Sequence, residues 1–483
     1  MLNFGAIFNI LGFLMCGFGG AMLFPAGVSF IYGEPEILSF VTAAILAFFM
    51  GGNFIFMNHG AAKTLSHKDG FMLTALTWLV LGLLGAMPLH FSGVVPSVVD
   101  AVFESFSGLT TTGATVITGL DTLSKGVLFW RAMIQWLGGM GVVVLAIAVL
   151  PFLGIGGMQL YRTEMPGVVK DKLQPRLQET AKLLWVVYLL ITSACACYYY
   201  VFGMSGFDAV CHAFTTIATG GFANYDASFG AFNSPALEWG AILFMFMGGL
   251  NFSWHFMALH KQSLKVYYQD REFRIFVVYL LLVTLVVYIS WGIAQNSFED
   301  SHMRAALFNV ISIATTTGYA TTDYTLWSPF AGMVMIIIMF CGGCSGSTSG
   351  GLKMMRVILI AKQGFREIIR LLHPRSIQTI KVGGKVIGDD VLQTVWSFVG
   401  LFFFIFAAFT LCLSFMGLDI ITAFSAVAAT ITSAGPGLGE VGPAGNYAGL
   451  PSAAKILLCF SMVVGRLEIF TILVILTPQF WRR

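Results

Sequence analysis

Four short segments of the chain share a pattern that could bind a cation through the protein backbone. They align without gaps, and each carries a glycine with a hydroxyl residue two positions before it and an alanine twelve positions before it. The four sets are Ala101, Thr111 and Gly113; Ala209, Thr219 and Gly221; Ala306, Thr316 and Gly318; and Ala423, Ser433 and Gly435. A strand that directs successive carbonyl oxygens at one axis needs backbone angles, including positive φ, that glycine reaches without a steric penalty.

Rings of backbone carbonyl oxygens can replace the hydration shell of a monovalent cation. A single Thr-Thr-Gly would be a tight buried turn after a core helix, but four copies at matching positions favour a selectivity filter. The predicted filter residues are Thr110, Thr111, Thr112, Gly113, Ala218, Thr219, Gly220, Gly221, Thr315, Thr316, Thr317, Gly318, Thr432, Ser433, Ala434 and Gly435. No catalytic residue is predicted.

These segments need elements that hold them at membrane depth. Of the 483 residues, 57% are hydrophobic and only 10% are charged, which excludes a soluble fold. Ten apolar stretches long enough to cross a bilayer are predicted at 5–30, 37–58, 70–90, 128–150, 183–203, 237–259, 274–294, 330–360, 392–415 and 453–477. Each glycine-bearing segment lies between two of these stretches and is too short to cross the membrane, so it must enter the membrane and return on the same side.

Non-helical backbone at membrane depth is tolerated only where it is buried in protein or lines a watery cavity. The predicted fold is therefore an all-α polytopic membrane protein, with short helices whose negative dipole ends favour a cation.

Basic residues in short loops set the orientation of a membrane protein. When the loops are placed alternately, one side carries Lys63, Lys68, Arg162, Lys170, Lys172, Arg176, Lys182, Lys261, Lys265, Arg271, Arg274, the run from Lys353 to Lys385, Arg482 and Arg483. The opposite side keeps only Lys125, Arg131, Arg304 and Lys455 and collects many carboxylates. The first side is therefore predicted to be cytoplasmic, with both termini inside.

At these residues the chain resembles the TrkH, TrkG and KtrB superfamily of potassium transporters, which is related to the plant HKT proteins, and it is most similar to the TrkH branch. The resemblance includes the four segments, FWRAMIQWLGGMGVVVLAIAVLP (129–151), GGCSGSTSGGLKMMR (342–356) and GRLEIFTILVILTPQFWR (465–482). It implies four pseudo-fourfold M1-P-M2 pore-loop repeats around one central pore, preceded by two N-terminal transmembrane helices. The expected divisions are 1–68 for those helices and 69–160, 161–270, 271–388 and 389–483 for the repeats.

The resemblance also implies a substrate and partners. The filter glycines of the family fall on the four glycines above, and glycine rather than serine at Gly113 favours potassium, taken up across a bacterial cytoplasmic membrane. The fourth segment departs from the family, because Thr432, Ser433 and Ala434 stand where relatives often have an asparagine-bearing stretch. A homodimer on a cytosolic ring of nucleotide-binding regulatory subunits, called TrkA for TrkH-like members, is expected. The only expected ligand of this chain is potassium at the filter. The basic segment from Lys353 to Lys385 is either a positive-inside anchor or a docking site for that ring.

The eighth apolar stretch is interrupted by five glycines within eleven residues. Each glycine in the interior of a continuous helix would destabilise that helix by roughly 1 kcal/mol. One interpretation is a kinked helix that packs closely through small residues. The other, which the resemblance implies, is a loop that occludes the pore beneath the filter and moves aside. The expected gate residues are Gly342, Gly343, Cys344, Ser345, Gly346, Ser347, Thr348, Ser349, Gly350, Gly351 and Arg466.

Arg466 lies in an apolar stretch, where a charge costs about 2.5–3.5 kcal/mol on insertion scales. We expect it to point into the pore, to hydrogen-bond the carbonyls of the loop and to add a positive barrier. An internal ion pair between helices is the alternative. Glu468 is two positions further along and would face elsewhere on a continuous helix.

Other classes of function fit the sequence less well. Leu352 separates Gly351 from Lys353, so the Gly-Lys-Ser/Thr of a phosphate-binding loop is missing, and the sequence contains no HExxH or GxSxG. His212 and His255 are expected to pack or to line the pore. The chain is therefore not expected to be an enzyme. The main alternative is a potassium symporter coupled to protons or sodium, which would need intramembrane carboxylates.

Overall fold

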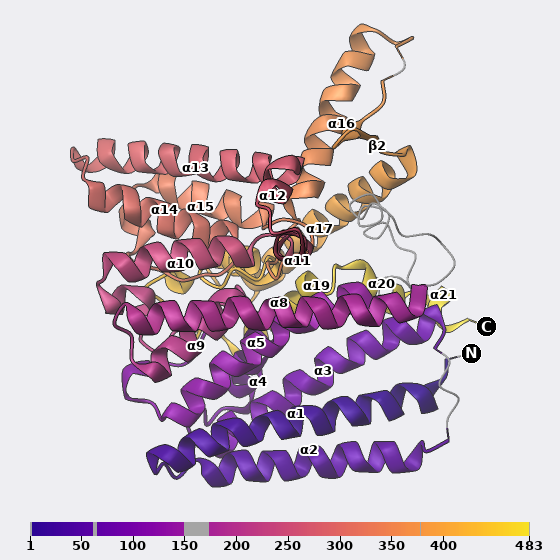
Figure 1. Ribbon diagram of the computed structural model, residues 1–483, viewed down its shortest axis with the longest axis vertical. Helices are drawn as coiled ribbons and strands as arrows, with labels where there is room; N and C mark the ends of the chain where they lie inside the picture. The colour runs from indigo at the N-terminus through magenta and orange to yellow at the C-terminus, as the bar shows by residue number, and fades with distance from the viewer. Residues whose placement is uncertain (1, 61–64, 149–172, 377, 483) are drawn as a thin grey trace.

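The computed structural model describes residues 2–60, 65–148, 173–376 and 378–482. Its long helices lie side by side, and the two ends of the chain lie at the same end of the helix bundle (Figure 1). One helix, α16 (Met354–Leu372), projects from the bundle together with a small hairpin (Figure 1). The predicted all-α fold is confirmed.

Two N-terminal helices, α1 (Phe4–Tyr32) and α2 (Ile37–Met57), pack along each other. Four sets follow, each with an outer helix, a short pore helix and an inner helix. The outer helices are α3 (His67–Phe91), α8 (Leu173–Val201), α13 (Arg271–Gln295) and α17 (Asp389–Phe415). The pore helices are α4 (Val98–Leu109), α9 (Gly206–Ile217), α14 (Asp300–Ala314) and α18 (Ile420–Ile431). The inner helices are α5 (Lys125–Ala148), α10 (Pro235–Gly248) with α11 (Phe252–Lys261), α15 (Pro329–Cys341) with α16, and α19 (Ser452–Arg466) with α20 (Phe470–Leu476).

Shorter elements complete the chain. They are α12 (Lys265–Gln269), α21 (Pro478–Trp481) and the 3₁₀ helices η1 (Leu120–Thr122), η2 (Ser228–Phe232), η3 (Tyr324–Leu326) and η4 (Gly439–Val441). The strands β1 (Lys381–Val382) and β2 (Lys385–Val386) pair antiparallel, with Lys381 opposite Val386. This hairpin follows the projecting α16.

The four pore helices are packed in a closed ring. Each contacts the outer and inner helices of its own set and the inner helix of the preceding set. Thus α9 packs on α5, α14 on α10, and α18 on α15. The remaining pore helix, α4, packs on α19, so the fourth set adjoins the first. This is the pseudo-fourfold arrangement that the family resemblance implies.

Three of the four pore helices begin at side-chain caps, and all four are enclosed by protein; α14 has no side-chain cap bond. Ser97, Ser205 and Asp419 each accept a hydrogen bond from the backbone N–H three residues later, which satisfies an otherwise orphaned donor of α4, α9 and α18. Nearly every residue in the second half of each pore helix is buried. These short helices are therefore surrounded by protein and not by lipid.

Among the described residues, six helices are long and apolar enough to cross a membrane: α1, α2, α3, α8, α13 and α17. Two pairs that bend sharply, α10–α11 by 99° and α19–α20 by 113°, would bring the number to eight. The other two predicted stretches fall on α5 and on the interrupted α15–α16. The predicted repeat boundary at 160 and 161 lies outside the described residues, as do Lys63, Arg162, Lys170, Lys172 and Arg483.

Candidate functional site

The four glycine-bearing segments follow the pore helices directly and meet in one place. A Cβ atom added to each glycine would collide with a carbonyl oxygen of the next segment. The distances would be 2.2 Å from Gly113 to Gly220, 1.9 Å from Gly221 to Thr317, 2.3 Å from Gly318 to Ala434 and 2.6 Å from Gly435 to Thr112. Because the last of these contacts returns to the first segment, the segments form a closed ring, and a side chain at any of the four glycines would displace its neighbour.

All four segments begin with the same backbone shape. In the first, Thr112 N–H donates to the Ser107 carbonyl (2.8 Å) and Thr111 N–H donates to the Gly108 carbonyl (3.0 Å), and the other three repeat both bonds. These are the two bonds of a Schellman motif, which requires a left-handed residue after the helix. That residue is the predicted hydroxyl residue, with φ of 54° at Thr111, 52° at Thr219, 56° at Thr316 and 57° at Ser433. The four glycines also have positive φ, between 76° and 89°.

Threonine and serine rarely adopt this conformation, which costs roughly 1–2 kcal/mol for a residue with a Cβ. Strain of this kind persists only where the surrounding structure enforces it, and it concentrates at functional sites. Positive φ was predicted for the glycines but not for the hydroxyl residues. Their recurrence two positions before each glycine was the available signal.

Each segment is tied back to its own pore helix at the residue three positions after the glycine. The four hydrogen bonds are Val116 N–H to Glu104 Oε2 (2.9 Å), Asn224 Nδ2 to Asp208 Oδ1 (2.8 Å), Asn309 Nδ2 to Thr321 Oγ1 (3.0 Å) and Leu438 N–H to Ser425 Oγ (2.9 Å). The residue types differ in every repeat, so alignment of the segments could not reveal this shared restraint. It fixes the strand on the far side of each glycine.

Gln135 on α5 holds the second segment from the neighbouring repeat. Its Nε2 donates to the Gly220 carbonyl (2.6 Å) and its Oε1 accepts from Phe222 N–H (3.0 Å). The amide therefore hydrogen-bonds both peptide groups that flank Gly221. Gln135 is fully buried. Gln135 lies within the 129–151 motif, but no pattern in the sequence indicated this role.

A buried ion pair lies beside that amide. Arg131 Nε donates to Glu104 Oε1 (2.9 Å), and Arg131 Nη1 donates to the Ala223 carbonyl (3.0 Å). Both charged side chains are almost completely shielded from solvent. The sequence argument counted Arg131 among the charges of one membrane side, whereas the structure places it inside the protein, where it links the first pore helix to the second segment.

Tyr447 makes the corresponding link between the fourth repeat and the first. Its hydroxyl donates to the Gly435 carbonyl (2.8 Å), and its backbone N–H donates to the Thr115 carbonyl (2.9 Å). The side chain is buried. Tyr447 lies outside the aligned segments, so their pattern gave no indication of it.

All of the expected gate residues except Arg466 form one loop between α15 and α16 that lies against the ring. Gly350 N–H donates to Thr316 Oγ1 (2.7 Å), and Thr219 Oγ1 donates to Thr348 Oγ1 (3.2 Å). A Cβ atom at Gly350 would lie 2.0 Å from the Thr432 carbonyl. The loop therefore contacts the second, third and fourth segments at the level of their hydroxyl residues.

The hydroxyls of the first and fourth segments form no hydrogen bond with the loop. Thr111 Oγ1 and Ser433 Oγ are buried and have no hydrogen-bond partner among the described residues. A buried hydroxyl without a partner costs free energy. These two oxygen atoms therefore have unused hydrogen-bonding capacity next to the ring.

The loop is anchored to two other parts of the molecule. Cys344 N–H donates to the Gly249 carbonyl (2.9 Å), where α10 ends. Glu272, in the first turn of α13 and fully buried, accepts from the N–H of Ser345 (2.8 Å) and from its hydroxyl (3.2 Å). The loop is thus a folded element with defined contacts and not a simple kink in a helix.

Arg466 is buried at the last position of α19 and points to the loop. Its Nη1 donates to the Thr348 carbonyl (2.7 Å), while Nε and Nη2 have no hydrogen-bond partner in the described part of the chain. Glu468 forms an ion pair with Arg356 of α16 instead (2.7 Å). The helix ends at Arg466, and the chain bends there through Glu468 and Ile469, which both have positive φ.

Neither histidine that we singled out joins a cluster suited to a metal ion. His212 Nδ1 lies 2.9 Å from the Asp208 carbonyl, and His255 contacts the Tyr267 hydroxyl (2.8 Å) and the Met247 carbonyl (3.0 Å). Across the described ranges, no group of three or more His, Cys, Asp and Glu residues could hold a metal. Both histidines have local packing roles.

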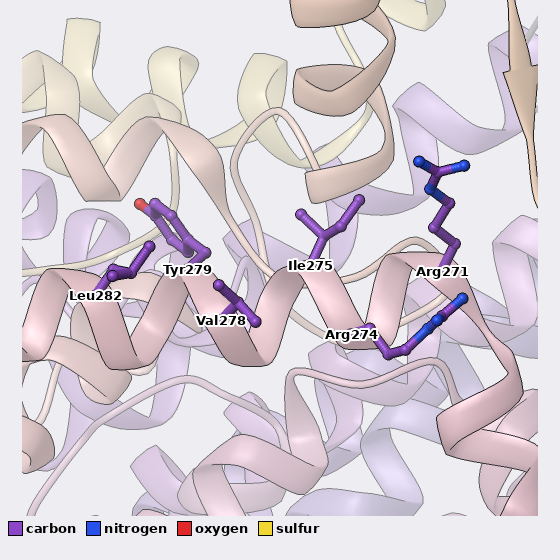
Figure 2. A pocket seen from close by; sticks show the side chains of 6 residues that line it. All are labelled: Arg271, Arg274, Ile275, Val278, Tyr279 and Leu282. Atoms are coloured by element: carbon purple, nitrogen blue, oxygen red, sulfur yellow. The ribbon is translucent and has the colours of Figure 1, made fainter.

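A separate cavity of about 610 Å³ lies along α13 (Figure 2). It is lined by Arg271, Arg274, Ile275, Val278, Tyr279 and Leu282. The two arginines lie at one end and the other side chains follow along the helix (Figure 2). The lining contains none of the predicted filter or gate residues.

Comparison with known proteins identifies similar chains over the full length. The model of the TrkH family, described as cation transport protein, matches residues 37–482. The chain is 44% identical over 479 residues to the Trk system potassium uptake protein TrkH of Halomonas elongata, covering 99% of both chains. It is 37% identical over 477 residues to the Trk system potassium uptake protein TrkG of Escherichia coli, covering 98% of both. The crystal structure of the potassium transporter TrkH from Vibrio parahaemolyticus superposes with a TM-score of 0.93 at 43% identity, covering all of both chains.

Proposed function

Since this chain belongs to the TrkH family of cation transport proteins, we propose that it takes up potassium ions across the bacterial cytoplasmic membrane through a gated, channel-like pore. The observation that carries the proposal is the closed ring of four segments, in which each glycine lies against a carbonyl oxygen of the next segment. Carbonyl rings of this kind can substitute for the water around a monovalent cation. The relatives that are named as potassium uptake proteins support potassium as that cation.

The proposed filter consists of the residues predicted from the sequence. The carboxyl ends of all four pore helices lead directly into it, and their dipoles favour a cation. The buried hydroxyls of Thr111 and Ser433, which have no partner among the described residues, would complete the ligand set at the inner end of the filter. Gly113 in the first segment supports potassium over sodium, because any side chain there would displace the Gly220 carbonyl.

The proposed gate is the loop Gly342–Gly351 together with Arg466. The contacts of Thr348 and Gly350 with three segments of the ring support this proposal, because a loop held there would block an ion that leaves the proposed filter. The guanidinium of Arg466 adds a positive charge at the same place and holds the loop through Thr348. Conduction would require both to move aside.

The proposed membrane arrangement places both termini in the cytoplasm, at the end of the bundle where Figure 1 shows them together. The protein would act as a homodimer on a cytosolic TrkA-like ring of nucleotide-binding subunits. The name of the relatives, which describes a Trk system, supports further components. The projecting α16 and its hairpin, with Arg366 and Arg370, form the surface proposed to face that ring.

A potassium symporter coupled to protons or sodium is the second candidate, and one observation favours it. Glu272 is a fully buried carboxylate in contact with the gate loop, and intramembrane carboxylates are typical of coupling sites. The sequence argument had placed the acidic residues in loops and at the outer face. Flux measurements distinguish the two candidates.

The test is cation flux into proteoliposomes that contain only the purified full-length protein. We expect potassium and rubidium uptake driven by the membrane potential alone, with little sodium or lithium uptake. Gly113→Ser should relax selectivity towards sodium, and Arg466→Ala should increase uptake. Gly119→Ser is the matched control for the first change, because Gly119 has a similar φ of 73° but no contact nearer than 3.8 Å. Arg274→Ala, at an exposed position, is the control for the second.

Uptake that requires a proton or sodium gradient, and that neither Gly113→Ser nor Arg466→Ala alters, would refute the gated filter and support the symporter.

A further inference from the structure

Lys353, which was not among the expected gate residues, turns its side chain back onto the gate loop. It is the last residue before α16 and has a positive φ of 69°, although it is not glycine. Its Nζ donates to the carbonyls of Ser347 (3.3 Å) and Ser349 and to the Ser347 hydroxyl (3.4 Å). A lysine near a membrane surface usually extends its charged end towards water. Here the ammonium is held by the loop.

Three consecutive carbonyls of the loop are therefore bound by cationic side chains. Lys353 holds those of Ser347 and Ser349, and Arg466 holds that of Thr348 between them. The same loop segment contacts the inner end of the ring through Thr348 and Gly350. Both charges are thus next to the exit of the proposed filter.

The Lys353 ammonium is bound by oxygen atoms of the kinds that bind potassium. Two carbonyl oxygens and one hydroxyl oxygen surround it, and we call these three atoms the oxygen cage. Carbonyl and hydroxyl oxygens are the ligands that replace water around potassium. An ammonium group is a compact point charge with three donors and no acceptor, so it can satisfy the same oxygens.

We propose that Lys353 is a second gating residue, whose ammonium fills an oxygen cage that a potassium ion leaving the filter would otherwise enter. This inference rests on the proposed potassium pathway and adds to it. The closed gate would contain two fixed positive charges, and opening would free the carbonyls of residues 347 to 349. Because Lys353 directly precedes α16, the ammonium is attached to the start of the projecting helix, and a displacement of that helix would withdraw it.

The first test measures rubidium uptake by the full-length protein in proteoliposomes. Lys353→Met keeps an unbranched side chain and removes the charge. We expect uptake to rise by about tenfold, the effect of losing one hydrogen bond from a charged donor in the closed state. Lys265→Met, at an exposed lysine of α12, is the matched control and should leave uptake unchanged.

The second test does not depend on the transport rate. Crystals of the Lys353→Met protein soaked in thallium, a heavy substitute for potassium, should show anomalous density between the carbonyl oxygens of Ser347 and Ser349, and the parent protein should show none there. Absence of that density from the variant would overturn the cage.

The outcomes separate this inference from the proposed function. If Arg466→Ala increases uptake and Lys353→Met does not, the role of Lys353 is wrong and the proposed gate remains. If neither change increases uptake and Gly113→Ser leaves selectivity intact, the proposed function fails.

Discussion

The ring geometry predicts that alanine substitutions at the four filter glycines will differ in severity. All four glycines have similar positive φ, so the backbone penalty for alanine is roughly 1–2 kcal/mol at each of them. What differs is the clash with the next segment. The Thr317 carbonyl would have to retreat from 1.9 Å to ordinary contact at about 3.4 Å in Gly221→Ala, while in Gly435→Ala the Thr112 carbonyl starts from 2.6 Å. We therefore expect Gly221→Ala to be the most damaging change and Gly435→Ala the mildest.

The displaced atoms are the proposed ligands of the ion, so the damage should appear in selectivity. Every 1.4 kcal/mol of lost discrimination between potassium and sodium is about tenfold in their ratio. The assay is the ratio of potassium to sodium permeability, from the reversal potential of proteoliposomes. We expect that ratio to fall by more than about tenfold in Gly221→Ala, with Gly113→Ala and Gly318→Ala between the two extremes.

The matched control is Gly119→Ala. It has the same backbone penalty, with φ of 73°, but no atom within 3.8 Å of the added Cβ. Its permeability ratio should equal that of the parent. If Gly435→Ala were as damaging as Gly221→Ala, or if Gly119→Ala also lost selectivity, the argument from contacts between neighbouring segments would be refuted.

Two further changes test the side chains that hold the ring. Gln135→Met should lower the potassium to sodium permeability ratio and the midpoint of thermal unfolding. It leaves the Gly220 carbonyl and Phe222 N–H without their partners, which destabilises the fold by about 1–3 kcal/mol for each buried group. An unchanged ratio would show that the amide has no part in selectivity. Tyr447→Phe removes one hydrogen bond to the Gly435 carbonyl, worth about 1 kcal/mol, and should change the same ratio by less than Gln135→Met does; a larger effect at Tyr447 would contradict this ranking.

The sequence predicted those features of the site that depend on local pattern. The four segments could be found because glycine, hydroxyl and alanine recur at fixed spacing within one chain, and the short helices follow from their length and from the apolar stretches on either side. The interruption of the eighth stretch was visible in its glycines, and the structure ends α15 at Cys341, the residue before the first of them. Composition excluded a soluble fold, and the recurring apolar stretches of bilayer length indicated the all-α membrane fold.

Contacts between repeats could not be predicted in this way. Gln135 meets the second segment 85 residues further along the chain. The bond from Arg466 to the loop, 118 residues before it, was the exception, because a charge in an apolar stretch pointed to it. No spacing rule covers such distances. The position of Glu468 could not be predicted from helical spacing either. It was expected to lie on a continuous helix, but the helix ends at Arg466, and Glu468 forms an ion pair with Arg356 on α16.

The asymmetry of the site follows from having four unequal repeats in one chain. Gly138, Gly248 and Gly465 lie at matching places on the inner helices of the first, second and fourth repeats, each close to a pore-helix carbonyl. In the first and second repeats the next residue is a second glycine. In the fourth repeat the following residue is Arg466. A ring of four identical subunits would place a guanidinium at this level four times, and two unit charges 4 Å apart repel by about 4 kcal/mol at an effective dielectric constant of 20. A single arginine avoids this repulsion and meets a single loop, which the third repeat provides. The proposed gate therefore depends on divergence among repeats, while the proposed filter depends on their likeness.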